Sequence, residues 1–302
     1  MKRKVIAGIM TVALSVTALT GCGSTPSVSK TEESKGTIRV GSKDFTENEV
    51  VAEVYARALE DAGYTVERKF DIASSVIHQS ITSDEIDLYP EYTGTGLISI
   101  LGESPLTDAD AVYQKVKEEY ASQFDITWLE YAQANDGQGI FVSKKISDEL
   151  GITTISELQA HASEVRFASQ GEFDEREDGI PGLEKAYGPF AWKSTKVYDN
   201  GLKYSVVEND EADASPAYTT EGQLSQTDKF VLLEDDKHVW PPYNLAPIVR
   251  NNVLDEHPEI ADVLNKVSAS LDTATVTKLN ARVDVDKEEY EDVALDYYNS
   301  IK

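Results

Sequence analysis

The sequence contains one cysteine, Cys22, and few basic residues for its length of 302. A single cysteine cannot form an intramolecular disulfide, so the fold has to be stabilised by its hydrophobic core. Lysine and arginine number 28 against 54 aspartate and glutamate residues, which gives a net charge of −26. A surface with this charge repels nucleic acid and anionic lipid head groups, and we therefore expect no nucleic-acid partner.

Motifs of known catalytic chemistry are also absent. The sequence has no Gly-x-Ser-x-Gly, no His-Glu-x-x-His and no Walker A loop. The segment Asp284-Val285-Asp286 lacks the glycine of a calcium loop. The four histidines are not spaced as metal ligands: His78, His161, His238 and His257. We expect no catalytic residues, no metal and no cofactor, so the protein is predicted not to be an enzyme.

Only the N-terminus carries a long hydrophobic run. Basic residues 2–4 precede an apolar segment over residues 5–19, which is shorter than a membrane-spanning helix needs. Leu19-Thr20-Gly21-Cys22 follows and resembles a bacterial lipobox, with Cys22 as the lipidated residue. We predict a lipoprotein signal peptide over residues 1–21 and a lipid-anchored, flexible tether over residues 22–36. The alternative is a buried cysteine after an ordinary secretory signal.

From residue 37 onward, segments with the period of strands alternate with helical segments. Strands are expected at residues 37–40, 65–70, 85–89, 140–142, 165–168, 230–234 and 248–250. A Thr46-x-x-Glu49 capping box is expected to open the first helix, and Gly63 to end it. The alternation predicts α/β architecture with parallel sheets of βαβ units. We find no internal sequence repeat.

Ligands of open α/β sheets bind beyond the carboxyl ends of the strands, so the following turns are candidate site segments. They are residues 41–45, 89–96, 135–139, 169–179, 215–221 and 240–245. Aromatic residues fall within them: Tyr89, Tyr92, Tyr218, Tyr243 and Trp240. A permanently charged ammonium cannot accept a hydrogen bond, and aromatic ring faces are its best protein partners. The tyrosines together indicate a site for such a cation, although a single turn tyrosine is usually a surface residue.

Two basic residues in the same turns are candidates for binding an anionic end of a ligand. Lys43 precedes the N-terminus of the first expected helix, and Arg176 lies among carboxylates in residues 171–179. A zwitterionic ligand needs both of its ends held. The spacing around Arg176 by itself favours a local salt bridge, and binding of a ligand carboxylate stays open as the alternative.

Five motifs stand out along residues 37–302. They are Gly41-Ser42-Lys43-Asp44-Phe45-Thr46-Glu47, Asp87-Leu88-Tyr89-Pro90-Glu91-Tyr92-Thr93-Gly94-Thr95-Gly96, Glu172-Phe173-Asp174-Glu175-Arg176-Glu177-Asp178-Gly179, Ala217-Tyr218-Thr219-Thr220-Glu221-Gly222 and Pro241-Pro242-Tyr243-Asn244-Leu245-Ala246-Pro247. In this order they resemble the osmoprotectant-binding proteins of glycine betaine/carnitine/choline ABC importers. The resemblance implies a type II periplasmic-binding-protein fold, with two α/β lobes joined by a two-strand hinge. We expect lobe 1 over residues 37–140 and 243–302, and lobe 2 over residues 141–242.

The resemblance also implies an aromatic cage for a trimethylammonium group. Tyr92, Tyr218 and Tyr243 match cage positions. The positions that bind the ligand's carboxylate in betaine-binding members correspond to Lys43, Thr95 and Arg176.

The sequence departs from the family pattern at Gln138, where a fourth cage tyrosine is usual. An amide can hydrogen-bond a polar ligand group but offers no aromatic face. Tyr131 and Trp240 are candidates for the missing wall of the cage.

We therefore expect an extracytoplasmic, monomeric lipoprotein on the outer face of the cytoplasmic membrane, which it contacts through the lipid anchor only. Its expected ligand is a small quaternary-ammonium compound such as glycine betaine, choline, carnitine or a related betaine, and its expected partners are an ABC permease and ATPase. In the main alternative, Gln138 redirects the same fold to a ligand without a quaternary nitrogen, such as an amino acid. A surface adhesin or sensor of this fold is a further alternative.

Overall fold

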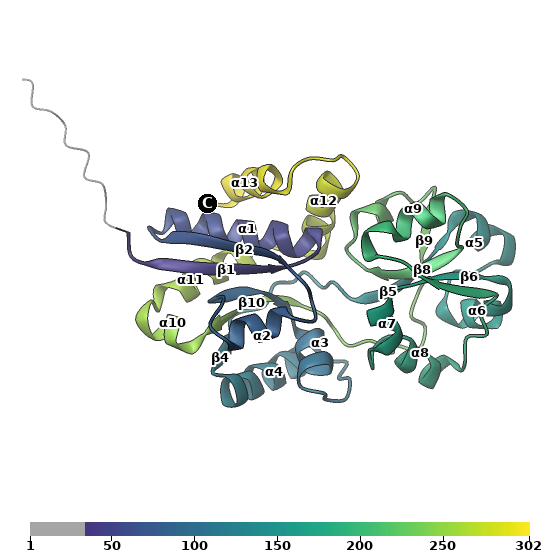
Figure 1. The fold of residues 1–302 in the computed structure, drawn as a ribbon, viewed down its shortest axis with the longest axis horizontal. Coiled ribbons are helices and arrows are strands. Elements are labelled where there is room, and N and C mark those ends of the chain that lie inside the picture. Colours follow the sequence, from purple (N-terminus) through teal and green to yellow (C-terminus); the bar gives the residue numbers. More distant parts are fainter. Residues whose placement is uncertain (1–33) are drawn as a thin grey trace, which may run out of the picture. The chain divides into compact units, whose positions relative to one another are not determined.

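The computed structural model describes residues 34–302, and the predictions for the signal peptide, Cys22 and most of the tether lie outside the described residues. Within residues 34–302, the strands form two five-stranded sheets, each accompanied by helices (Figure 1). We call the half built on the first sheet lobe 1 and the half built on the second sheet lobe 2. No helix in this part of the chain combines the length and apolar character that a membrane span requires.

The sheet of lobe 1 has the strand order β2-β1-β3-β10-β4. Its strands are β1 (Thr37–Lys43), β2 (Thr65–Ile72), β3 (Leu88–Tyr92), β4 (Ile126–Trp128) and β10 (Leu245–Arg250). β1 runs parallel to β2 and β3, as the alternation predicts, but β10 is antiparallel to both of its neighbours. The prediction of a wholly parallel sheet is therefore wrong, because β10 returns from lobe 2 and is not part of a βαβ unit.

The sheet of lobe 2 repeats this arrangement in the order β7-β6-β8-β5-β9. Its strands are β5 (Gln138–Ser143), β6 (Arg166–Ser169), β7 (Ser194–Val197), β8 (Ala214–Tyr218) and β9 (Phe230–Leu232). β6 is parallel to β7 and β8, and the crossing strand β5 is antiparallel to its neighbours. Each sheet is therefore mixed, and in each the antiparallel inner strand is the one through which the chain enters from the other lobe.

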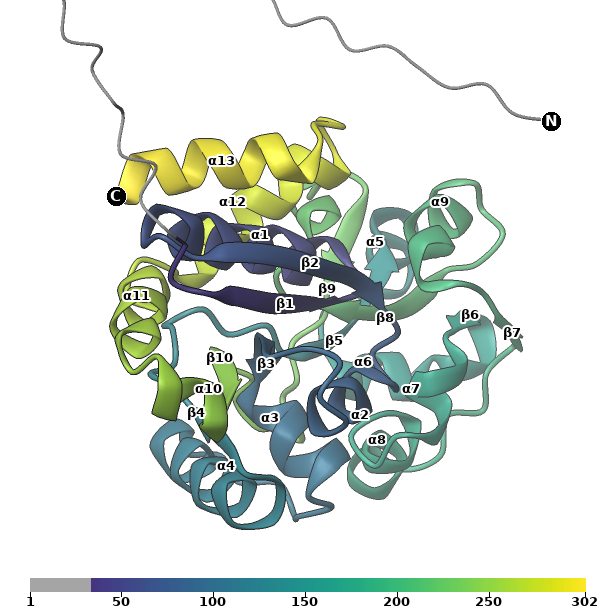
Figure 2. The same ribbon diagram turned by 60° about the vertical axis from the view of Figure 1, so that its left-hand side comes forward.

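Helices pack on both faces of the lobe 1 sheet, and Figures 1 and 2 both show α12 and α13 beside α1 on one of them. The helices of lobe 1 are α1 (Thr46–Asp61), α2 (Ile77–Thr82), α3 (Thr93–Thr95), α4 (Ala109–Phe124), α10 (Asn251–Glu256), α11 (Glu259–Ser268), α12 (Thr273–Asp284) and α13 (Tyr290–Ile301). Alternate residues of β10 enter two different cores: Leu245 and Val249 join α1, whereas Ala246 and Ile248 join α2 and α4.

Lobe 2 has a smaller core on each side of its sheet. Its helices are α5 (Lys144–Leu150), α6 (Ile155–Ala160), α7 (Gly171–Glu175), α8 (Ile180–Tyr187) and α9 (Lys203–Glu208). Ile140 and Val142 of β5 pack towards α6 and α8, while the intervening Phe141 packs with Tyr204 of α9 at a centroid distance of 4.4 Å. The two-residue period of strands thus builds a core on either face.

The local signals of the first helix have mixed outcomes. The capping box predicted at Thr46 and Glu49 is wrong: Phe45 is the N-cap without a side-chain cap, and the Thr46 hydroxyl donates to Asp284 at 2.6 Å. The capping box would need the Thr46 hydroxyl, but this hydroxyl is bonded to Asp284, which is distant in the sequence. The stop at Gly63 is confirmed, because Gly63 follows the helix with φ of 97°.

Two segments, residues 129–137 and 233–244, connect the lobes and pair with each other. Asn135 and Asn244 form an antiparallel bridge, and the amide of Asp136 donates to the carbonyl of Tyr243 at 3.1 Å. The predicted lobe boundary between residues 140 and 141 falls inside β5, which begins at Gln138. These crossing segments carry side chains to the region between the two sheets.

The two lobes share a short motif, so the expectation of no internal repeat is wrong. Residues 84–92 are Asp-Glu-Ile-Asp-Leu-Tyr-Pro-Glu-Tyr, and residues 210–218 are Asp-Glu-Ala-Asp-Ala-Ser-Pro-Ala-Tyr. Each segment forms the middle strand of its sheet, β3 or β8, and ends on a tyrosine, Tyr92 or Tyr218. The match is too short to stand out from the sequence until the strands are aligned.

Candidate functional site

One cavity of about 260 Å³ brings together all seven residues predicted to bind a ligand. We call it the tyrosine cavity. The predicted residues that line it are Lys43, Tyr92, Thr95, Gln138, Arg176, Tyr218 and Tyr243. The other residues in its lining are Phe45, Ser74, Ser75, Glu91, Ser99, Ile100, Asp136 and Glu172.

All six candidate turns contribute to this lining. β1 ends at Lys43 and β3 at Tyr92 in lobe 1, while β6 ends at Ser169 and β8 at Tyr218 in lobe 2. The carboxyl ends of the parallel strands of both sheets therefore point at the same space, as expected for a ligand site in α/β folds.

Two of the three tyrosines, Tyr92 and Tyr243, are held by hydrogen bonds of their hydroxyls. The Tyr92 hydroxyl donates to Glu47 at 3.0 Å, and the Tyr243 hydroxyl donates to Asp178. The Tyr243 ring lies against Gly94, where a Cβ atom would come within 2.6 Å of the ring. Glycine is therefore required at position 94 for Tyr243 to occupy its place.

Burial raises the pKa of all three phenols. The negative charge of Glu47 adds to this effect at Tyr92, and that of Asp178 adds to it at Tyr243. The tyrosines are therefore neutral at physiological pH, and their ring faces remain available to a cation.

Lys43 lies inside the cavity with its charge already balanced. Its ammonium group forms an ion pair with Glu91, and both side chains are almost fully buried. The Tyr89 hydroxyl donates to the second oxygen of Glu91 at 2.8 Å. The Lys43 ammonium is also 5.1 Å from the centroid of Tyr92, in a cation–π arrangement.

Arg176 forms the local salt bridge that its sequence context predicts, and it also lies in the cavity lining. Its Nε and Nη2 atoms donate to the two oxygens of Asp178 at 2.7 and 2.6 Å, which is the local salt bridge. Its Nη1 atom is 3.7 Å from Glu172 at the cavity wall. Burial alone lowers the pKa of Arg176, but the hydrogen bonds and charge of Asp178 outweigh it and raise the pKa. Arg176 is therefore charged, and it lines the cavity together with Glu172.

Phe45, and neither of the two aromatic candidates, supplies a fourth ring to the cavity lining. Tyr131 donates to Asp110 at 2.5 Å, Trp240 donates to the carbonyl of Asp178 at 2.7 Å, and neither lines the cavity. The Phe45 ring instead stacks on Tyr92 and Tyr218, with centroid distances of 6.0 and 5.6 Å. The cavity therefore has four aromatic residues in its lining.

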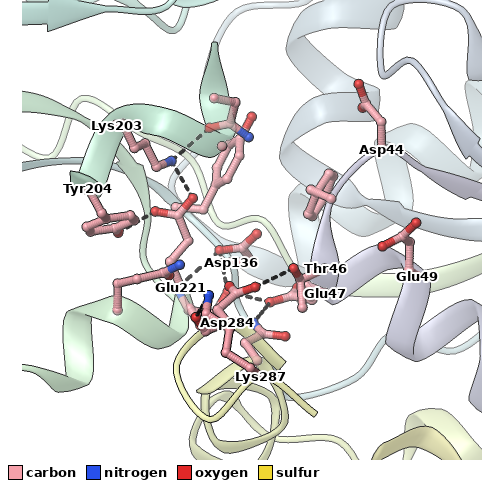
Figure 3. A pocket seen from close by; sticks show the side chains of 17 residues that line it. Asp44, Thr46, Glu47, Glu49, Asp136, Lys203, Tyr204, Glu221, Asp284 and Lys287 are labelled. Carbon is pink, nitrogen blue, oxygen red and sulfur yellow. Dashed lines mark hydrogen bonds and ion pairs between the residues drawn. The ribbon is translucent and has the colours of Figure 1, made fainter. Parts of the chain in front are cut away.

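A second cavity, of about 330 Å³, lies beside the first and is shown in Figure 3. We call it the acidic cavity. Its lining contains two lysines, Lys203 and Lys287, and six carboxylates: Asp44, Glu47, Glu49, Asp136, Glu221 and Asp284. Lys203 forms an ion pair with Glu221, so negative charge is left in excess.

At the acidic cavity, Thr220 of lobe 2 bonds to lobe 1 through its hydroxyl and through its carbonyl, which accepts from Asn280 at 2.9 Å. Thr220 of lobe 2 contacts both Glu47 of lobe 1 and, at 2.6 Å, Asp136 of the crossing segment. A hydroxyl has one proton, so it can donate to one of these two groups at a time, and a protonated carboxyl group would complete the second contact. Burial raises the pKa of both Glu47 and Asp136, in agreement with such a protonation.

The sequence interpretation missed Phe45, Glu91, Asp136 and Glu172 as site residues. Phe45, Glu91 and Glu172 lie within the motifs that carry the family resemblance, and Asp136 lies in a predicted turn, so attention to every residue of these segments would have found them. Three serines had no such signal: Ser74, Ser75 and Ser99.

A two-lobed α/β fold with a cavity between strand ends of both sheets defines a substrate-binding protein. Residues 36–300 match the substrate binding domain of ABC-type glycine betaine transport systems, and the chain belongs to this family. A glycine-betaine-binding protein of Pseudomonas aeruginosa is 32% identical over 86% of this chain and 86% of that protein.

Two further comparisons agree with this assignment. The ergothioneine transport permease/ergothioneine binding protein EgtU of Helicobacter pylori is 30% identical over 85% of this chain, which spans 46% of that longer protein. The crystal structure of a glycine betaine/carnitine/choline ABC transporter protein matches with a TM-score of 0.71 and 24% identity, over 87% of this chain and 98% of that one. This last likeness shows the fold.

The family settles the class of protein. The chain is a substrate-binding component of the betaine/carnitine/choline group of ABC importers and not an enzyme. Such extracytoplasmic proteins bind small ligands and work with permease and ATPase components. The predicted fold and family are thus confirmed.

Proposed function

We propose that this protein captures a small quaternary-ammonium compound in an aromatic cage between its lobes. Glycine betaine, choline, carnitine and related betaines are the candidate ligands. The observation that carries the proposal is the lining of one cavity by Tyr92 of lobe 1, Tyr218 of lobe 2 and Tyr243 of the crossing segment. Because the rings come from both lobes, a bound cation would hold the lobes together.

The rings of this site already attract ammonium groups of the chain itself. Lys43 lies 5.1 Å from the centroid of Tyr92, and Lys203 lies 5.2 Å from that of Tyr218. A desolvated cation gains up to about 2 kcal/mol from each ring face. A trimethylammonium group has no N–H to lose, so it depends on such faces more than lysine does.

The carboxylate of a betaine would be bound by the polar residues of the same cavity. Arg176 lines the cavity, and its Nη1 is not used by Asp178; the side chains of Thr95 and Gln138 make no hydrogen bond within residues 34–302. Lys43 retains donors beyond the one used by Glu91. The relatives named for glycine betaine and ergothioneine bind compounds that combine a quaternary nitrogen with a carboxylate.

Titration calorimetry tests this function directly. The purified protein is titrated with glycine betaine, choline, carnitine, proline betaine and ergothioneine, with glutamine and arginine as controls. Micromolar affinity for at least one quaternary amine, about −8 kcal/mol of binding free energy, is the expected result. No binding of any quaternary amine, with binding of an amino acid, would overturn the proposal in favour of a non-quaternary ligand.

We also propose that Cys22 carries a lipid, so that the protein is held on the outer face of the cytoplasmic membrane as a monomer. The support is the order of the basic, apolar and Leu-Thr-Gly-Cys segments at the N-terminus. Metabolic labelling with a radioactive fatty acid should mark the wild type. The variant Cys22→Ala should lose the label, and retention of the label would contradict the anchor.

A further inference from the structure

The tyrosine cavity and the acidic cavity are separated by a thin wall. Only three residues belong to the lining of both: Phe45, Asp136 and Tyr218. Asp136 is fixed by Thr220, whose hydroxyl and amide nitrogen both lie within hydrogen-bond distance of its carboxylate. The removable part of the wall is therefore the aromatic pair of Phe45 and Tyr218, one ring from each lobe.

The backbone of Phe45 is fixed, so its ring can leave the wall only by side-chain rotation. Phe45 is the N-cap of α1, and its carbonyl accepts a hydrogen bond from the amide of Glu49 at 3.2 Å. Its ring makes angles of 29° with both Tyr92 and Tyr218, which flank it. Two stacked neighbours favour this rotamer over one that points into solvent.

The Phe45 ring lies at the site and is not enclosed in a core. Phe45 is the residue before α1, is only partly buried, and lines both cavities. Phe173, inside α7 of lobe 2, is by contrast only 4% exposed and packs in the core of that lobe.

We propose that Phe45 is a specificity-determining residue that closes the tyrosine cavity towards the acidic cavity and sets the longest ligand the site accepts. This inference rests on the proposed binding of quaternary amines. A ligand whose ammonium group lies among the tyrosines meets the Phe45 ring before it reaches the carboxylates beyond.

The charge of the acidic cavity determines which longer ligands would enter if Phe45 were removed. Six carboxylates face two lysines there, and Lys203 is already paired with Glu221. The distal end of a long ligand would therefore gain from a positive charge and lose from a negative one. Removal of Phe45 should favour a dication over a zwitterion of the same length.

Four proteins and three ligands test this proposal by calorimetry. The proteins are the wild type, Phe45→Ala, Phe45→Leu and the matched control Ile100→Ala. Ile100 lines the tyrosine cavity but not the acidic one, so its truncation adds space without opening the wall. The ligands are choline, (6-aminohexyl)trimethylammonium and (6-carboxyhexyl)trimethylammonium. Phe45→Leu keeps the test open if Phe45→Ala fails to fold.

The affinity for the long dication should rise at least about tenfold in Phe45→Ala relative to wild type, with a smaller rise in Phe45→Leu. The long zwitterion should gain less, and Ile100→Ala should gain for neither. Equal dication affinity in wild type and both Phe45 variants, or the same gain in Ile100→Ala, would overturn the role of Phe45. Choline binding to the wild type separates the two failures: absence of choline binding contradicts the proposed function, whereas choline binding together with equal dication affinities contradicts only the role of Phe45.

Discussion

Each lobe contains the same arrangement of one arginine and two aspartates, which links two neighbouring strands of its own sheet. In lobe 1, Arg39 of β1 donates to Asp87 with its backbone amide at 2.7 Å and its Nε at 3.0 Å. In lobe 2, Arg166 of β6 makes the same two bonds to Asp213, at 2.8 and 2.9 Å. The repeated Asp-Glu-x-Asp segment thus has a structural role, which joins the turn before each middle strand to its parallel neighbour.

The first aspartate of each segment has the same backbone conformation. Asp84 and Asp210 have φ of 66° and 60°, and their carbonyl oxygens accept from Arg39 and Arg166 respectively. Aspartate tolerates this left-handed region better than most residues. Both turns are therefore built around a carbonyl that the arginine can reach.

The lobes differ in what supports this arrangement. Arg250 of β10 reaches Asp84 at 2.8 Å and Asp87 at 3.6 Å, so the carboxylates of lobe 1 have a second guanidinium. In lobe 2 the only additional cation is Lys145, 3.5 Å from the exposed Asp210, within residues 34–302. Lobe 2 therefore depends more heavily on a single arginine.

The largest expected effect follows from this difference. Arg166→Met should lower the free energy of unfolding by about 3 kcal/mol, because it leaves the mostly buried Asp213 without a cation. Arg39→Met should cost about half as much, since Arg250 remains near Asp87. Urea denaturation of both variants checks the order, with Lys144→Met as an exposed-pair control that should cost less than about 0.5 kcal/mol. Equal losses for the two arginines would show that Arg250 does not compensate.

Tyr92 and Tyr218 end the middle strands of the two sheets, so their variants compare the two lobes at the ligand site. Tyr92→Ala and Tyr218→Ala should each weaken binding of a quaternary amine at least about tenfold, near 1.4 kcal/mol. Tyr92→Ala should also lower the melting temperature, because Tyr92 is 3% exposed and bonded to Glu47, whereas Tyr218 is only partly buried.

Tyr218→Phe is the matched control for this pair. The Tyr218 hydroxyl makes no hydrogen bond within the described residues, so the variant should keep its affinity in calorimetry. Unchanged affinity in both alanine variants would exclude the cage.

The smallest expected effect concerns pH. Burial, followed by the charges of Asp71 and Glu291, raises the pKa of Glu49 from 4.5 to about 7. The folded state binds the Glu49 proton more tightly than the unfolded state does. The contribution of Glu49 to the free energy of unfolding is therefore most favourable below pH 4.5, and this advantage is lost as the pH rises to 7. Glu49→Gln should therefore gain stability relative to wild type over this interval, by less than about 1 kcal/mol because Glu49 is only half-buried.

Lobe 2 supplies the control for this pH effect. Glu175, at the end of α7, follows the corresponding strand of lobe 2 and is exposed. Thermal unfolding of Glu175→Gln should show the same pH dependence as wild type. If the melting temperature of Glu49→Gln varied with pH in the same way as that of wild type between pH 4.5 and 7, the raised pKa of Glu49 would be contradicted.

Much of the fold follows from local patterns. The period of apolar residues placed β1, β2, α1 and the C-terminal helices, because each buries one face or stripe of its own side chains. The six turns were found because residues that follow parallel strands lie at one edge of a sheet. Local patterns failed at Thr46, whose hydroxyl is taken by Asp284 from a helix more than two hundred residues away.

The sequence by itself determined the family, the segments of the site and the three tyrosines, since these depend on short motifs and their order. Only the tertiary structure decided that β5 and β10, which follow the two connecting segments, run antiparallel to their neighbours. It also decided that Arg176 is paired with Asp178 while still lining the cavity, and that Phe45 divides two cavities. These features depend on contacts between distant segments, which the periodicity of a single strand or helix does not encode.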